Sequence, residues 1–405
     1  MKPAQRPLSI YLIAGEESGD TLGGALARAL LAQEQGSIRF AGVGGQAMAA
    51  AGIASPFPIN DLSIIGFTTI PRRLPTILRR IRETADAVVA ARPDALVIID
   101  SPDFTHRVAR RVRAREPSIP ILDYVSPTVW AWRPWRARAM RRYVDSVLAI
   151  LPFEPAVHVR LGGPPCFYVG HPLIERLADL RPNAEEKQRR EADPPLILVL
   201  PGSRSSELHR LLPIFGSAVA RVGEGIGAVE LVLPTMPHLL ARVREEIARW
   251  PVQPRIVLEP KEKWAAFRNA RAALAASGTV TLELALSGVP TVAAYRVPLI
   301  EEIVARTMRM PEMSTIILTN LIIGENIVPE FLQRDCTPEK LADALIPLIS
   351  DTVERRRQLE AFQRLDTIMG IGTLRPSAQA AAIVADIARR GRHDLAAVKL
   401  ALPPR

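Results

Sequence analysis

Two turns in the second half of the chain combine small residues with the start of a predicted helix. The first turn, residues 200–207, follows an apolar segment and contains Gly202, Ser203 and Arg204. Gly202 permits a tight bend, the amides that follow can point at an anion, and the Arg204 guanidinium is a permanent forked donor to phosphate oxygens. The alternative is an ordinary strand-to-helix turn with a capping serine. The spacing matches neither a P-loop nor a Gly-x-Ser-x-Gly nucleophile turn.

The second turn has the same character and lies in the same half of the chain. It places Ser277, Gly278 and Thr279 before a helix and Glu283 one turn into it. The small residues would present another helix start to a diphosphate, and Glu283 could accept hydrogen bonds from ribose hydroxyls. Two such turns in one domain predict a nucleoside diphosphate far better than either turn alone. Because the sequence has no Asp-x-Asp or His-Glu-x-x-His and its six histidines are scattered, we expect no metal and no cofactor.

Acids and glycines follow the first predicted strand. Glu16, Ser18 and Gly19 stand where a dinucleotide fingerprint would stand, but the spacing differs and the acids would repel a pyrophosphate. Glycines with acids suit the hydroxyls of a sugar. The alternative for Glu17 and Asp20 is a helix start with favourable acidic charges.

A carboxylate ends the buried segment that follows. Asp100 lies at the carboxyl tip of a predicted strand, which is the usual place of a catalytic group in a parallel α/β sheet. Transfer of a group to an alcohol needs a base for the hydroxyl proton, and Asp100 can supply it. Asp103 is the other candidate, although a residue at this point of a helix is more often a cap. We favour Asp100 and keep Asp103 as a substrate contact.

These residues need parallel sheets to position them. Short apolar runs alternate with helical patterns, which indicates βαβ units and two Rossmann-like, doubly wound α/β domains in tandem. The predicted strands are 9–14, 38–43, 95–100, 119–125 and 146–151 in the first half, and 196–200, 229–233, 255–258, 272–276 and 291–294 in the second. We expect domains at 1–170 and 171–365, with a polar connection over 181–195. For the helix and tail at 366–405, packing back on the first domain is left open.

Composition limits the partners. The 405 residues carry a net charge of +10, with a pI near 10.2, which favours an anionic partner, although genomic base composition explains an arginine excess equally well. Tryptophan and arginine share the stretch 125–142, and apolar residues with arginine share 64–82, so we expect peripheral contact with an anionic membrane and no nucleic acid. The alternative is a packed tryptophan with a solvated arginine face. Cys166 and Cys336 stand apart and fit a reducing cytoplasm.

Taken together, the motifs resemble one family, lipid-A-disaccharide synthase, an inverting GT-B-type glycosyltransferase family of Gram-negative bacteria. The resemblance runs from about residue 10 to residue 333. The segments that carry it are 15–20, 99–104, 125–133, 151–154, 169–173, 200–207 and 276–283.

The resemblance implies two domains that face a cleft and transfer of 2,3-diacylglucosamine from its UDP derivative to 2,3-diacylglucosamine 1-phosphate. The product would be a β-1,6-linked disaccharide, made at the inner membrane. By position, Asp100 looks like the base, Arg204 like a diphosphate contact and Glu283 like a ribose contact.

One segment departs from the family pattern. Residues 319–330 match at Asn320, which we expect on the donor side, but Glu325-Asn326 replaces the familiar Arg-Glu, so Glu325 is left unassigned. The rivals are a peptidoglycan-precursor UDP-GlcNAc transferase, a UDP-GlcNAc 2-epimerase and, from another class, a basic RNA-binding module. The sequence leaves the oligomeric state open.

Overall fold

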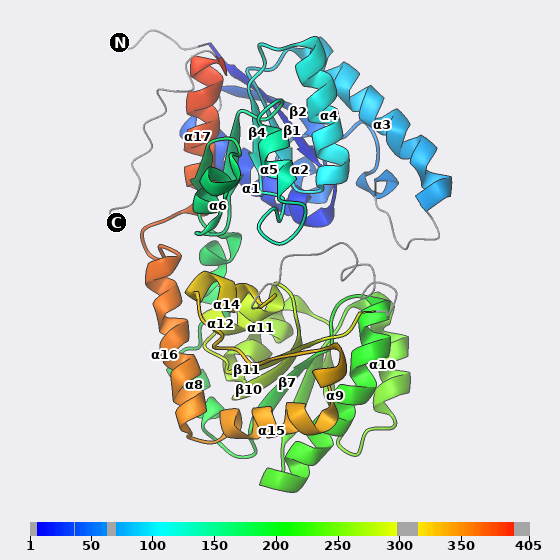
Figure 1. Cartoon of the computed structure of the whole chain (residues 1–405), viewed down its shortest axis with the longest axis vertical. Helices are drawn as coiled ribbons and strands as arrows, with labels where there is room; N and C mark the ends of the chain where they lie inside the picture. Colours follow the sequence, from blue (N-terminus) through cyan, green and yellow to red (C-terminus); the bar gives the residue numbers. More distant parts are fainter. Residues whose placement is uncertain (1–5, 36, 63–69, 298–314, 393–405) are drawn as a thin grey trace. The chain divides into compact units, whose positions relative to one another are not determined.

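The chain folds into two compact units, each with one parallel sheet (Figure 1). The computed structural model describes residues 6–35, 37–62, 70–297 and 315–392. Unit 1 comprises Met1–Ile174 and Gly372–Arg405, and unit 2 comprises Glu175–Ile371. Helices flank both sheets, so the predicted α/β doubly wound class is confirmed.

The sheet of unit 1 has the order β2-β1-β3-β4-β5-β6. All five residues of β3 are buried, as expected for a parallel strand covered on both faces. From β1 the chain continues to β2 on one side of it in the strand order, and from β3 it continues to β4 in the opposite direction. The strand order therefore reverses between the neighbours β1 and β3, and ligands usually bind at such a switch point. The strands are β1 Leu8–Ala14, β2 Ile38–Val43, β3 Ala95–Ile99, β4 Ile121–Tyr124, β5 Ser146–Ala149 and β6 Cys166–Tyr168.

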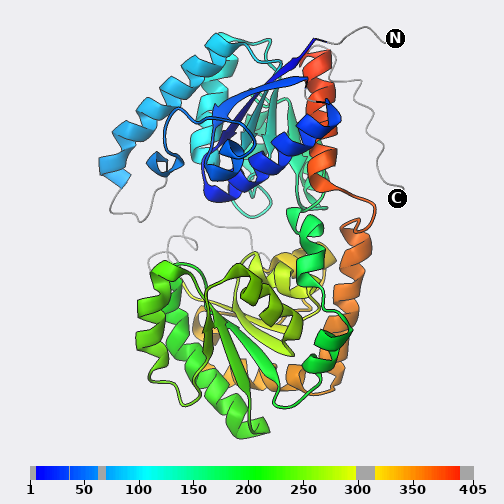
Figure 2. The ribbon, with the colours of Figure 1, turned by 180° about the vertical axis from the view of Figure 1, so that it is seen from behind.

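The last helix among the described residues belongs to unit 1. Helix α17 packs beside α1 and on strands β1 and β3, as both views show (Figures 1 and 2). Its apolar residues Ala380, Ile383 and Val384 enter the same core as Leu12 of β1. The helices of unit 1 are α1 Glu17–Gln33, α2 Gln46–Ala49, α3 Ile70–Ala91, α4 Pro102–Arg115, α5 Trp135–Met140, α6 Glu154–Leu161 and α17 Pro376–Arg390, with a 3-10 turn at Ile59–Asp61.

The sheet of unit 2 has the order β12-β11-β10-β7-β8-β9, and its switch point lies between β7 and β10. The strands are β7 Leu196–Leu200, β8 Glu230–Pro234, β9 Arg255–Val257, β10 Ala272–Ala276, β11 Thr291–Tyr295 and β12 Glu330–Leu332. The helices are α7 Leu177–Leu180, α8 Ala184–Arg190, α9 Ser205–Ile226, α10 Leu240–Ile247, α11 Pro260–Asn269, α12 Val280–Leu286, α14 Leu318–Ile323, α15 Pro338–Ile349 and α16 Val353–Ile368. Further 3-10 turns lie at Pro172–Arg176, Pro237–Leu239 and Gln333–Asp335.

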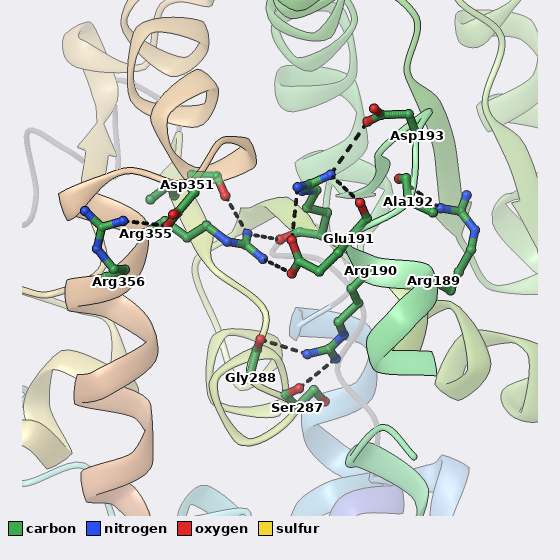
Figure 3. Close-up of polar contacts among 12 residues, drawn as sticks. Arg189, Arg190, Glu191, Ala192, Asp193, Ser287, Gly288, Asp351, Arg355 and Arg356 are labelled. Carbon is green, nitrogen blue, oxygen red and sulfur yellow. Dashed lines mark hydrogen bonds and ion pairs between the residues drawn. The ribbon is translucent and has the colours of Figure 1, made fainter. Parts of the chain in front are cut away.

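The polar stretch 181–195, which we expected to connect the domains, is fastened to unit 2 by arginines (Figure 3). The buried Arg190 guanidinium donates to four backbone carbonyl oxygens, two of them those of Ser287 at 2.7 Å and Gly288 at 2.9 Å. Burial lowers the pKa of Arg190 to about 10, so the group remains charged at neutral pH. Arg355 reaches Glu191 in the same cluster, at 3.0 Å. Polar composition here therefore marks a buried hydrogen-bond network within a domain.

Candidate active site

A cavity of about 690 Å³ opens at the switch point of unit 2. Parallel neighbours β7 and β10 end side by side there, which brings their following turns together. The cavity falls within the range of small-molecule sites, about 300–1,000 Å³. It is lined by seven of the residues selected from the sequence, Gly202, Ser203, Arg204, Ser277, Gly278, Thr279 and Glu283.

The amides of the first turn are hydrogen-bonded to a carboxylate of the chain itself, that of Glu207. Glu207 Oε2 accepts hydrogen bonds from the amides of Ser203 at 3.0 Å and Arg204 at 3.2 Å. Gly202 has φ +109°, and a Cβ there would lie 2.3 Å from Glu207 Oε2, so only glycine fits. The amides that we expected to face an anion are therefore engaged. The Arg204 side chain remains 76% exposed, with one guanidinium nitrogen 3.2 Å from Glu207 Oε1.

The second turn leaves more hydrogen-bonding capacity unused. Among the described residues, the amides of Gly278 and Thr279 have no acceptor, whereas the Ser277 amide continues the sheet to Ala294 O at 3.0 Å. Thr235 and Trp264 also line the cavity. The buried hydroxyl of Thr235 and the buried indole N–H of Trp264 have no hydrogen-bond partner among the described residues. Buried polar groups of this kind usually have a partner, which here a ligand or water could provide.

Lysine and aromatic residues of this cavity escaped the sequence analysis. Lys263 Nζ lies 2.9 Å from Glu283 Oε2 and 4.2 Å from the centroid of the Trp264 ring. The guanidinium carbon of Arg176 also lies over that ring, 4.7 Å from its centroid. Lys263 and Trp264 lie near the start of α11, the helix after β9, so the rule that ligands bind at the carboxyl ends of parallel strands could have found them.

In unit 1 the switch point brings Asp100 to the turn after β1. Ser18 Oγ donates to Asp100 Oδ2 at 3.0 Å. Asp100 and Ser101 have φ values of +52° and +46°, a costly backbone for non-glycine residues that is concentrated at functional sites. A Cβ on Gly15 would meet Ser101 Cβ at 2.6 Å, so glycine is required for the two turns to approach. The structure therefore joins two segments that are 82 residues apart in the sequence.

The other selected residues of unit 1 lie around this pair. Glu16 is exposed immediately before α1, and Gly19 is buried so that an added Cβ would lie 3.1 Å from Ile99 O. Asp103 is on the first turn of α4 and has a 79% exposed side chain. Asp20 has the structural role that was the alternative for it, because its carboxylate accepts from three amides at 2.7 to 3.0 Å around the start of α2.

Asn320 is not among the residues that line the unit 2 cavity. It is 1% exposed, and its carboxamide donates to Val328 O at 3.0 Å and accepts from the amides of Ile327 and Val328. The side chain therefore holds the loop after α14. Glu325 pairs with Arg364 of α16 at 2.8 Å, which gives it a structural contact outside the cavity.

The stretch rich in tryptophan and arginine divides into buried and exposed parts. Trp130 is partly buried against Phe153, whereas Trp135 is 63% exposed. The apolar residues 64–67 lie outside the described residues. Within the described ranges no helix is long and apolar enough to span a bilayer. The same ranges contain no group of three or more His, Cys, Asp or Glu side chains placed to hold a metal.

Comparison with known proteins decides the family. The family model for lipid-A-disaccharide synthetase matches residues 10–384. The chain belongs to the lipid-A-disaccharide synthase family. Among its relatives, the lipid-A-disaccharide synthase of Bradyrhizobium diazoefficiens is 61% identical over 384 residues, covering 95% of this chain and 97% of the relative. That of Rhodospirillum centenum is 42% identical over 386 residues, covering 94% and 95%.

Solved structures with the same fold are distant in sequence. A glycotransferase of kitacinnamycin matches with a TM-score of 0.61 at 17% identity, covering 94% of this chain and 99% of that one. The UDP co-structure of S. aureus MnaA matches with 0.59 at 13% identity, covering 94% and 95%. Acinetobacter baumannii MurG matches with 0.53 at 17% identity, covering 94% and 100%. At such identities the likeness establishes the fold, which is of the GT-B type.

Proposed function

We propose that the protein transfers 2,3-diacylglucosamine from its UDP derivative to 2,3-diacylglucosamine 1-phosphate, forming the β-1,6-linked lipid A disaccharide and UDP. Membership of the synthase family supports the reaction. The single observation that carries the assignment of the donor site is the cavity between the turns after β7 and β10.

The donor nucleotide is assigned to unit 2. Arg204 and Lys263 supply positive charge for the diphosphate, and the unpaired amides of Gly278 and Thr279 supply neutral donors. Glu283 is assigned to the ribose hydroxyls, held in place by Lys263. These groups stabilise departing UDP through direct contacts with the chain.

The acceptor base is assigned to Asp100. The 6-hydroxyl oxygen of the acceptor attacks the anomeric carbon of the donor, the bond from that carbon to the UDP oxygen breaks, and the hydroxyl proton passes to Asp100. Attack from the face opposite the leaving group inverts the anomeric configuration. Ser18 orients the carboxylate through its hydrogen bond to Oδ2. Asp100→Asn is expected to lower kcat about 10²- to 10⁴-fold, while UDP affinity is unchanged. Near-normal turnover of Asp100→Asn would exclude Asp100 as the base.

The assay for the proposed function is mass spectrometry of the products of the purified protein with both substrates in mixed micelles. We expect the acylated disaccharide phosphate and one equivalent of UDP. A UDP-GlcNAc 2-epimerase would instead convert water-soluble UDP-GlcNAc without an acceptor, and that result would overturn the proposal.

Peripheral contact with the anionic inner membrane, at its cytoplasmic side, is proposed for unit 1. The exposed Trp135 lies among the exposed residues Arg138, Arg141 and Arg142, and an exposed tryptophan beside arginines suits a membrane interface. Trp135→Ser is expected to weaken sedimentation with phosphatidylglycerol vesicles. Unchanged sedimentation of this variant would remove Trp135 from the contact.

A further inference from the structure

A second, smaller cavity lies in unit 1, against one face of helix α4. Asp103, His106, Arg107 and Arg110 follow one another at intervals of three, one and three residues, which places them on the same side of the helix. Residues from the segment before and within α5 close the cavity. Its lining is Pro102, Asp103, His106, Arg107, Arg110, Arg133, Arg136 and Tyr143.

Positive charge in this cavity exceeds what its own acids can balance. Four guanidinium groups share it with one lining carboxylate, Asp103, and the contact of Asp103 Oδ1 with Arg136 is long, at 3.4 Å. Within the described ranges no carboxylate lies within 4.0 Å of Arg107 or Arg133. Arg110 lies over the Tyr143 ring, 4.7 Å from its centroid. Unpaired guanidinium groups gathered in a concave site attract an anion with several oxygens.

The wall behind the arginines is fixed by buried contacts. His106 is 6% exposed, with Nε2 3.1 Å from Asp123 Oδ2 and Nδ1 3.1 Å from the Tyr143 hydroxyl. Tyr143 also accepts from Arg110 Nη2 at 3.2 Å. Arg110 is exposed, but its guanidinium is held against the buried Tyr143, which reduces the conformational entropy lost when an anion binds.

The size and position of the cavity limit which kind of ligand it can bind. Its volume of about 140 Å³ is below the range of about 300–1,000 Å³ for whole small molecules, so it suits one charged group. The lining begins at Pro102, two residues after Asp100. We infer that this cavity binds the phosphate monoester of the acceptor, so that the acceptor is recognised by its charge beside the proposed base. The inference rests on the proposed function.

The same chemistry could come from a phospholipid headgroup, and the test separates the two sources. The variant Arg107→Gln/Arg133→Gln removes the two guanidinium groups of the cavity that have no carboxylate partner among the described residues; Arg133 lies over the Trp132 ring, 5.0 Å from its centroid. The matched control Arg111→Gln/Arg160→Gln removes two exposed arginines of unit 1 that do not line the cavity. Each protein is assayed in mixed micelles with 2,3-diacylglucosamine 1-phosphate and with the unphosphorylated 2,3-diacylglucosamine.

We expect the variant to lose about 10- to 100-fold in kcat/KM with the phosphorylated acceptor, because the phosphate loses charge-assisted hydrogen bonds from two guanidinium groups. Its kcat/KM with the unphosphorylated acceptor, its KM for the donor and its sedimentation with phosphatidylglycerol vesicles should equal those of the control. Equal losses with both acceptors, or reduced vesicle binding with intact acceptor kinetics, would overturn the inference and, in the second case, indicate a headgroup site.

Failure of the proposed function would be recognised separately, because the wild-type protein would then form no disaccharide. The cavity is tested without turnover by calorimetry with glucosamine 1-phosphate. Binding by the wild-type protein that Arg107→Gln/Arg133→Gln lacks supports the inference. Absence of binding by the wild-type protein contradicts it.

Discussion

Replacing Gly202 by alanine tests how the first turn of the donor cavity is held. The glycine has φ +109°, and an added Cβ would lie 2.3 Å from Glu207 Oε2, which must then move. A side chain at a positive φ costs roughly 1–2 kcal/mol. Displaced Glu207 would lose its hydrogen bonds to the amides of Ser203 and Arg204, each worth about 1.5–3 kcal/mol as a bond to a charged group. With partial relaxation we expect a local cost of about 3 kcal/mol.

The assay is thermal unfolding and calorimetry with UDP. For a unit of this size, about 3 kcal/mol lowers Tm by about 6–12 °C, and the displaced turn should weaken UDP binding about 10- to 100-fold. Gly227→Ala is the matched control. Gly227 follows the C-terminus of α9, the helix that begins after the first turn, and it has φ +89°, but an added Cβ there meets nothing within 4 Å. It carries the backbone strain without the collision. If Gly202→Ala matched Gly227→Ala in Tm and bound UDP normally, the role given to Glu207 would be refuted.

Two further predictions concern single side chains. Glu283→Gln should raise the Kd for UDP about tenfold, as for loss of a bond to a charged group, and should abolish the preference for UDP over 2′,3′-dideoxy-UDP; a retained preference would place the ribose elsewhere. His171 is buried, its Nδ1 accepts from the Leu173 amide at 3.2 Å, and burial lowers its pKa to about 4. Since the unfolded imidazole titrates near 6.5, the folded state is favoured above that pH and loses up to about 3 kcal/mol as the pH falls from 6.5 towards 4. His171→Asn should flatten this part of the urea-unfolding free energy against pH, and an unchanged slope would contradict the burial argument.

Strand positions were predictable because parallel strands buried on both faces are continuous apolar runs. The run at 196–200 coincides with β7, and that at 272–276 with β10. Strands β6 and β12, each of three residues at the edge of its sheet, were missed, whereas β9, equally short and also at an edge, was predicted at 255–258. The return of α17 to unit 1 rests on contacts between residues over 300 positions apart, such as Gln33 with Ala378.

Site residues were predictable where they directly follow a strand, and less so where contacts between distant parts of the chain determine which side chains come together. Residues 202–204 and 277–279 were found by their place in the chain. Two features needed side-chain geometry: the Glu207 carboxylate that accepts from the amides of the first turn, and the arginine cavity, whose four arginines come from α4, from the segment before α5 and from α5 itself. The polar residues around Arg190 were misleading because polar composition usually marks solvent exposure, whereas here backbone carbonyls satisfy a buried guanidinium.

The central claim is that UDP binds in the cavity between the turns after β7 and β10. Gly278 lines this cavity, and a Cβ added to it meets nothing within 4 Å, so Gly278→Phe would fill the site with little strain. The measurement is calorimetric titration of the wild-type protein and Gly278→Phe with UDP, with Tm recorded for both. We expect one UDP bound per wild-type chain and none by the variant at a similar Tm. Equal UDP binding by the two proteins would contradict the account.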